Sequence, residues 1–87
     1  MKISRRHSLG RAEVRAKVQE LADDLGDQYG LVSEWQGHDL SVKGTSISGW
    51  VRVSDDEVNV DLKLGFALLM LENTIRSSIN RLMDKHL

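Results

Sequence analysis

The sequence predicts a two-layer α+β domain, in which an antiparallel sheet of four to five strands carries two helices on one face. Residues 58–64 read Val-Asn-Val-Asp-Leu-Lys-Leu, an unbroken alternation of apolar and polar side chains. A period of two is typical of a strand with one face on a core and the other in water. Residues 8–29 and 66–87 show helical spacing instead. We therefore expect residues 1–87 to form one domain in the order β-α-β-β-β-β-α.

The N-terminal part of the chain predicts a strand followed by a helix. Residues 2–7 form a short strand in which Ile3 is the main core residue. Ser8 stands where a helix N-cap belongs, because its hydroxyl can accept a hydrogen bond from a free backbone amide. Gly30 suits the C-terminal end of the helix 8–29. The predicted core stripe of this helix is Val14, Val18, Leu21 and Leu25.

Three further strands are predicted over residues 31–36, 39–43 and 47–53, ahead of the strand 58–64. A two-residue turn places Trp35 opposite Leu40, and a four-residue loop places Val53 opposite Val58. Both hairpins put their apolar side chains on the same face, which supports the assignment of the strands. The other face collects polar side chains and is expected to be wet.

The helix predicted over residues 66–87 begins with the apolar run Phe66–Leu71. This run is more apolar than one face of a helix needs. Either it dips into the core, or Phe66, Leu69 and Met70 form an apolar patch for a partner or an apolar surface. The core stripe expected for this helix is Leu68, Leu71, Ile75, Ile79 and Leu82.

The net charge of −1 hides an uneven distribution. Residues 1–17 carry six Lys or Arg and one Glu, whereas residues 18–61 carry two Lys or Arg and ten Asp or Glu. The first helix is thus basic at its positive end and acidic at its negative end, against its dipole. Either partners on other elements compensate, or the basic end faces an anion. The candidate anion-facing residues are Lys2, Arg5, Arg6, Arg11 and Arg15.

The predicted polar face of the sheet contains one aromatic residue, Trp50, beside Arg52. This pair is a candidate surface contact that could stack on a base or on a partner's side chain. Asp61 and Glu34 lie on the same face, so a nucleic-acid partner is not expected.

Several classes of site are not expected from the sequence. The chain has no cysteine, and its three histidines do not share a metal-binding spacing. No nucleophile is paired with a base, and no glycine-rich phosphate loop is present. We therefore expect no enzyme, metal or cofactor. The longest apolar run has six residues against about 20 for a membrane helix, and no secretory signal is recognised, so a cytoplasmic protein is expected.

Several short motifs together resemble the polyhydroxyalkanoic acid system proteins, which are small bacterial proteins encoded near polyester-storage genes. The motifs are His7-Ser8-Leu9-Gly10, Tyr29-Gly30-Leu31, Trp35-Gln36-Gly37, Ser48-Gly49 and the segment 58–65. The resemblance implies a cytoplasmic protein linked to polyhydroxyalkanoate granules, with no established activity or catalytic residues. Two features depart from the pattern: no proline stands near Met70–Asn73, and Trp50 replaces a smaller residue.

These observations together predict a non-enzymatic accessory or binding protein whose partner is the granule or a granule-associated protein. Phe66, Leu69 and Met70 would supply the apolar contact. The alternative is a small helix-grip-like module that holds an apolar acyl ligand between helices and sheet. That alternative predicts a cavity beneath Gly49, where a side chain is missing opposite Leu62. The oligomeric state is not predicted.

Overall fold

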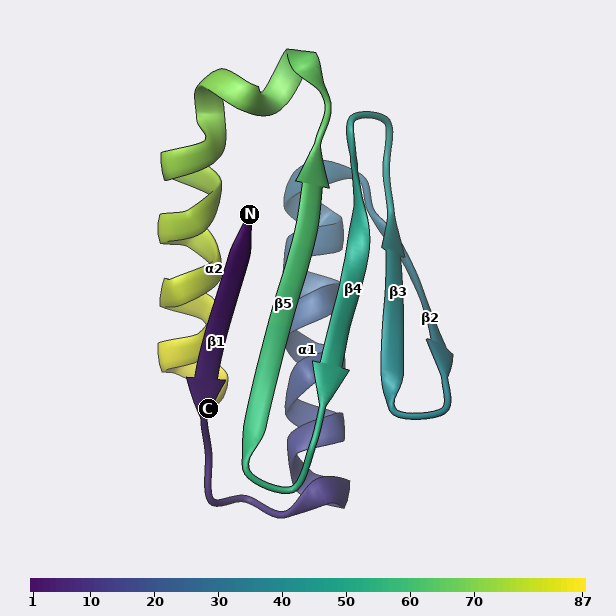
Figure 1. Cartoon of the computed structure of the whole chain (residues 1–87), viewed down its shortest axis with the longest axis vertical. Helices are drawn as coiled ribbons and strands as arrows, with labels where there is room; N and C mark the ends of the chain where they lie inside the picture. Colours follow the sequence, from purple (N-terminus) through teal and green to yellow (C-terminus); the bar gives the residue numbers. More distant parts are fainter.

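A computed structural model describes residues 1–87 and shows one five-stranded antiparallel sheet in the order β1-β5-β4-β3-β2. Both helices lie on the same face of this sheet, with α2 next to β1 and α1 behind the middle strands (Figure 1). The predicted two-layer α+β fold is therefore confirmed. The elements are β1 Lys2–Arg6, α1 Arg11–Tyr29, β2 Val32–Gln36, β3 Asp39–Lys43, β4 Ile47–Val53, β5 Glu57–Leu64, a 3₁₀ helix η1 Phe66–Leu71, and α2 Glu72–His86.

The strand register agrees with the hairpins expected from the sequence. Trp35 faces Leu40 across β2 and β3, and Val53 faces Val58 across β4 and β5. The first strand pairs with β5, so that Ile3 lies opposite Val60. The sheet therefore brings the N-terminal strand beside the last strand of the chain.

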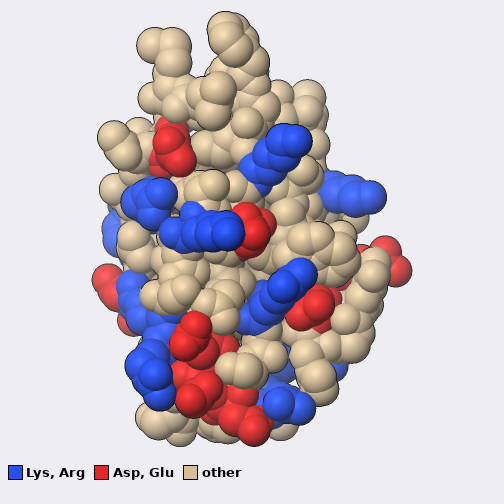
Figure 2. Space-filling view, viewed as in Figure 1, with Lys and Arg blue, Asp and Glu red and all other residues tan.

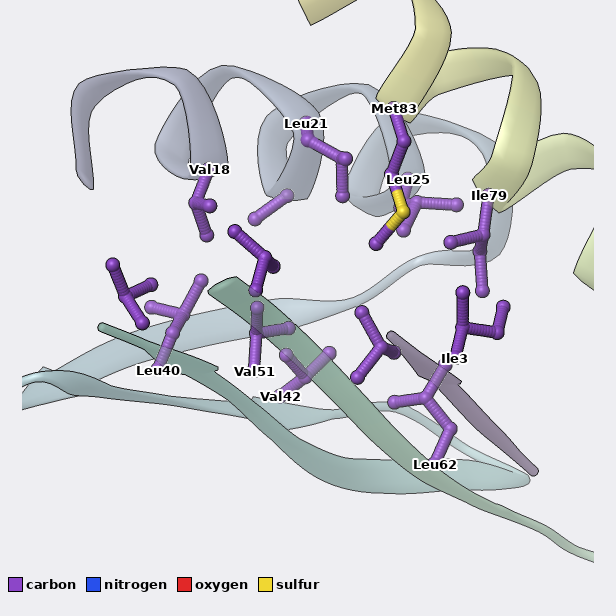
Figure 3. Close-up of a cluster of buried hydrophobic side chains, with 14 of the residues drawn as sticks. Ile3, Val18, Leu21, Leu25, Leu40, Val42, Val51, Leu62, Ile79 and Met83 are labelled. Carbon is purple, nitrogen blue, oxygen red and sulfur yellow. The ribbon is translucent and has the colours of Figure 1, made fainter. Parts of the chain in front are cut away.

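The core is a single layer between the sheet and the two helices. Side chains from α1 and α2 point toward those from the sheet, as Figure 3 shows. The core contains 18 buried apolar residues, and the four predicted from α1 are among them. Helix α2 contributes Ile75, Ile79 and Met83, which lie four residues apart on one face.

The start of α1 differs from the prediction, because Ser8 is not the N-cap. The helix begins at Arg11 and its N-cap is Gly10, which has φ 82° and offers no side-chain bond. A histidine holds the preceding loop instead: Nδ1 of His7 accepts from the Leu9 amide at 3.2 Å, and Nε2 donates to the Ser54 carbonyl at 2.9 Å. The turn out of β1 needs a positive φ, which glycine adopts most readily. Ser8 is left exposed.

The second helix also differs from the prediction. Residues 66–71 form a 3₁₀ helix, and the α-helix begins only at Glu72. A 3₁₀ helix has three residues per turn, whereas an α-helix has 3.6. The core positions predicted from α-helical spacing before Ile75 are therefore wrong in residues 66–71. Leu71, expected in the core, is 46% exposed, and Leu68 is only partly buried. Leu82, also expected in the core, is only partly buried, whereas its neighbour Met83 is fully buried.

The outer face of the sheet was expected to be exposed to water, but part of it is shielded. Ser41 is buried there, and Trp50 is half-buried. The two residues are direct cross-strand partners on β3 and β4. A large indole beside a small hydroxyl side chain shields it from water, which the alternation of residues along one strand cannot reveal.

Candidate apolar contact surface

The segment between β5 and α2 is an arch at one end of the molecule (Figure 1). Gly65 anchors its start, since its amide donates to the Ser46 carbonyl at 2.7 Å and its carbonyl accepts from the Leu68 amide at 2.9 Å. The arch is thus tied at its base to the turn between β3 and β4. We call its four large exposed apolar residues the apolar tip: Phe66, Leu69, Met70 and Leu71.

The side chains of the apolar tip are turned to solvent. Phe66 is 93% exposed, and Met70 is 96% exposed. The end of the molecule that the arch occupies is almost free of charged side chains, as Figure 2 shows. Contiguous exposed apolar residues of this kind mark contact surfaces in soluble proteins. The structure thus agrees with the second of the two sequence alternatives, an apolar patch, although its binding role stays a prediction.

Leu71 belongs to the tip although the sequence assigned it to the core. It was missed because α-helical spacing places it in line with Ile75. The available signal was the unbroken apolar run, since six successive apolar residues cannot all face one core.

Trp50 and Arg52 lie on the sheet face that no helix covers. A shallow hollow of about 190 Å³ lies beside them and is also lined by Lys2 and Asp61. Nε of Arg52 lies 3.9 Å from Oδ2 of Asp39. Charges of both signs border this hollow, so its electrostatics favour neither an anion nor a cation.

The candidate anion-facing residues are mostly engaged within the fold. Arg5 pairs with Asp84 at 2.6 Å and Arg11 pairs with Asp55 at 3.1 Å. These partners come from elements far away in the sequence, as the compensation alternative expects. The two other arginines are engaged as well, Arg6 with Asp56 at 3.2 Å and Arg15 over the Trp35 ring at 4.4 Å. Lys2 alone has neither an ion pair nor a cation–π contact.

The acidic half of α1 is compensated by the C-terminal end of α2. Nε2 of His86 lies 2.9 Å from Oδ2 of Asp24, and its Nδ1 lies 3.2 Å from Oε2 of Glu20. The hydrogen bond from His86 lowers the pKa of Asp24 below its ordinary value, and the positive charge of Lys85 acts in the same direction. This cluster joins the two helices.

The interior offers little room for a ligand. An apolar void of about 20 Å³, lined by twelve apolar side chains, lies between the helices and the sheet. Ligand pockets usually measure about 300–1,000 Å³. The space expected beneath Gly49 is absent, because a Cβ there would lie 2.0 Å from the carbonyl oxygen of Asp61. The backbone of β5 fills that space.

No helix has both the length and the apolar composition required to cross a membrane.

The chain was compared with protein families, curated proteins and solved structures. No curated protein and no solved structure matches the chain. A family model described as "Putative polyhydroxyalkanoic acid system protein" matches residues 1–87, and the chain therefore belongs to that family.

Proposed function

We propose that this protein is a non-enzymatic, cytoplasmic accessory protein of polyhydroxyalkanoate storage granules that binds the apolar granule surface through its apolar tip. The observation that carries the proposal is the nearly complete exposure of Phe66 and Met70 at the end of the molecule where Figure 2 shows almost no charged side chains. The family supports the link to the polyhydroxyalkanoate system.

The size of the tip fits adsorption to an apolar phase. Burying a phenylalanine or methionine side chain contributes about 1.5–3 kcal/mol each. Phe66 and Met70 together would thus contribute roughly 3–6 kcal/mol before the cost of association is subtracted. This attraction depends little on salt, because it does not come from charges.

The contacts of two of the three histidines support a non-enzymatic role. Both ring nitrogens of His7 are engaged by the backbone, and both ring nitrogens of His86 face carboxylates. These contacts join structural elements and leave no ring nitrogen of either residue free to act as a base.

Co-sedimentation with isolated polyester granules tests the proposal, with serum albumin as competitor and a salt series. We expect the protein to stay on the granules at high salt, and the Phe66→Ser/Met70→Ser variant to be released. Val32→Ser is the matched control, since Val32 is 74% exposed on the edge strand β2, outside the tip. Equal retention of the tip variant and the control would refute the role of the tip.

Two other partners are outcomes of the same experiment. A granule-associated protein as partner predicts binding to native granules and none to protein-free polyester particles. An enclosed acyl ligand predicts binding to neither, and a mass added to the protein in native mass spectrometry. The void of about 20 Å³ would have to open for such a ligand to enter.

A further inference from the structure

We propose that the apolar tip and two neighbouring lysines, Lys43 and Lys63, form one surface that binds an anionic phospholipid layer. The tip would enter the acyl region while the lysines contact the head groups. This inference rests on the proposed role of the tip and names the chemistry of the surface that it meets.

The two lysines belong to one row across the sheet. Lys43 lies opposite Ser48 on β3 and β4, and Ser48 lies opposite Lys63 on β4 and β5. Strands are about 4.8 Å apart, so the lysine backbones are separated by about 10 Å. Both lysines are exposed, and an open hollow of about 350 Å³ extends past Ser48 between them. We call Lys43, Ser48 and Lys63 the lysine row.

The lysine row lies next to the tip. Lys63 precedes Gly65, where the arch begins, by two residues, and Lys43 precedes the turn to which Gly65 is bonded. Figure 2 shows both positively and negatively charged side chains just below the uncharged end of the molecule. A surface that touches the arch at the edge of the sheet is therefore within reach of both long side chains.

The two lysines leave a net positive charge on this part of the sheet. Neither forms an ion pair, and the one acid that lines the hollow with them, Asp61, offsets only one of their two charges. Glu72 lies 3.9 Å from Arg76. The acidic Asp23 and Asp27 belong to α1, in the other layer of the fold. A negatively charged surface would thus complement the lysine row.

The small size of the tip favours a lipid layer over a protein partner or a second copy. A stable protein interface uses about 20–30 residues on each side, but the tip has four side chains. A lipid layer adapts to a protruding arch and requires no matching groove. Peripheral lipid binding typically combines an apolar anchor with basic residues, and the structure brings both together.

Vesicle flotation with the full chain tests this inference. We expect binding to vesicles of phosphatidylcholine with phosphatidylglycerol, and much weaker binding to phosphatidylcholine alone. Each lysine near an anionic surface is worth about 5-fold in affinity, so Lys43→Gln/Lys63→Gln should bind about 30-fold more weakly. Lys17→Gln/Arg81→Gln removes the same charge from the helices and is the control.

The outcomes separate this inference from the proposed function. Equal binding to the two kinds of vesicle, or equal loss in the lysine variant and its control, overturns the inference. Retention on lipid-free polyester particles without vesicle binding also overturns it and leaves the proposed function standing. Vesicle binding without retention on polyester particles would support this inference and refute the proposed function. Circular dichroism confirms that each variant is folded before its binding is measured.

Discussion

At Gly49 the backbone of β5 leaves no room for a side chain on β4. A Cβ at this position would lie 2.0 Å from the Asp61 carbonyl oxygen and 2.9 Å from the Leu62 Cα. These neighbours are backbone atoms of a central strand, so they cannot move aside as a flexible side chain could. The glycine therefore allows a close approach of two strands, which is a common reason for glycine inside a sheet.

Gly49→Ala should therefore destabilise the protein by about 3 kcal/mol, as overpacking of a close contact does. Urea denaturation of the variant and the parent protein measures this difference. Ser48→Ala, one residue away on the exposed side of β4, should change the free energy of unfolding by less than about 0.5 kcal/mol. A stable Gly49→Ala variant would show that β5 can shift without cost.

At the scale of single elements, α1 shows how a helix with unfavourable end charges is accommodated. Its basic N-terminal turn reaches Asp55 in the β4–β5 loop, while Asp24 near its C-terminal end binds His86 of α2. Arg11 and Asp24 thus each interact with a specific partner on another element, which offsets their unfavourable position in the helix dipole. The same contacts orient α1 relative to the sheet and to α2.

The Asp24–His86 contact should make stability depend on pH in the acid range. Because the pKa of Asp24 is lowered in the folded state, its contribution is fully present above the ordinary value of 3.8 and is lost as the pH falls through the folded value. Asp24→Asn should thus be less stable than the parent at pH 7, and the difference should vanish in strong acid.

Chemical denaturation at a series of pH values measures this effect. Asp27→Asn is the control, since Asp27 is exposed on the same helix and forms no ion pair. A difference between parent and Asp24→Asn that persists at a pH well below 3.8 would show that the contact acts through packing and not through the charge.

At the scale of the whole molecule, the two helices and the apolar face of the sheet enclose the core, and the arch stands outside it. Ile79 and Met83 are fully buried, whereas Phe66 and Met70 are almost fully exposed. The apolar residues thus divide into a group that stabilises the fold and a group that is free for contact.

The stability of variants should follow this division. Phe66→Ser/Met70→Ser should change the free energy of unfolding by less than about 0.5 kcal/mol, because the side chains lose no burial. Ile79→Ala should lose about 3 kcal/mol, because it leaves a cavity in the core. Thermal and urea denaturation measure both. A loss of several kcal/mol in the tip variant would mean that the arch packs on the core in solution.

The sequence by itself determined the strands, the register of the β2–β3 and β4–β5 hairpins and the core face of α1. These depend on a period of two, on short turns and on a period of 3.6, all of which are local patterns that the sheet and helix geometry preserve. The apolar run of residues 66–71 could also be recognised in the sequence, but the sequence left open whether it faces the core or the solvent.

Only the tertiary structure decided the features that depend on residues far apart in the chain. The arch is a 3₁₀ helix, and Gly65 at its start is bonded to Ser46 in a distant turn. The loop before α1 is likewise held by the contact of His7 with Ser54, and the N-cap is Gly10 and not Ser8. The row that joins Lys43 to Lys63 exists because three strands lie side by side. Local periodicity carries no information on such contacts, since they form only when the sheet brings distant segments together.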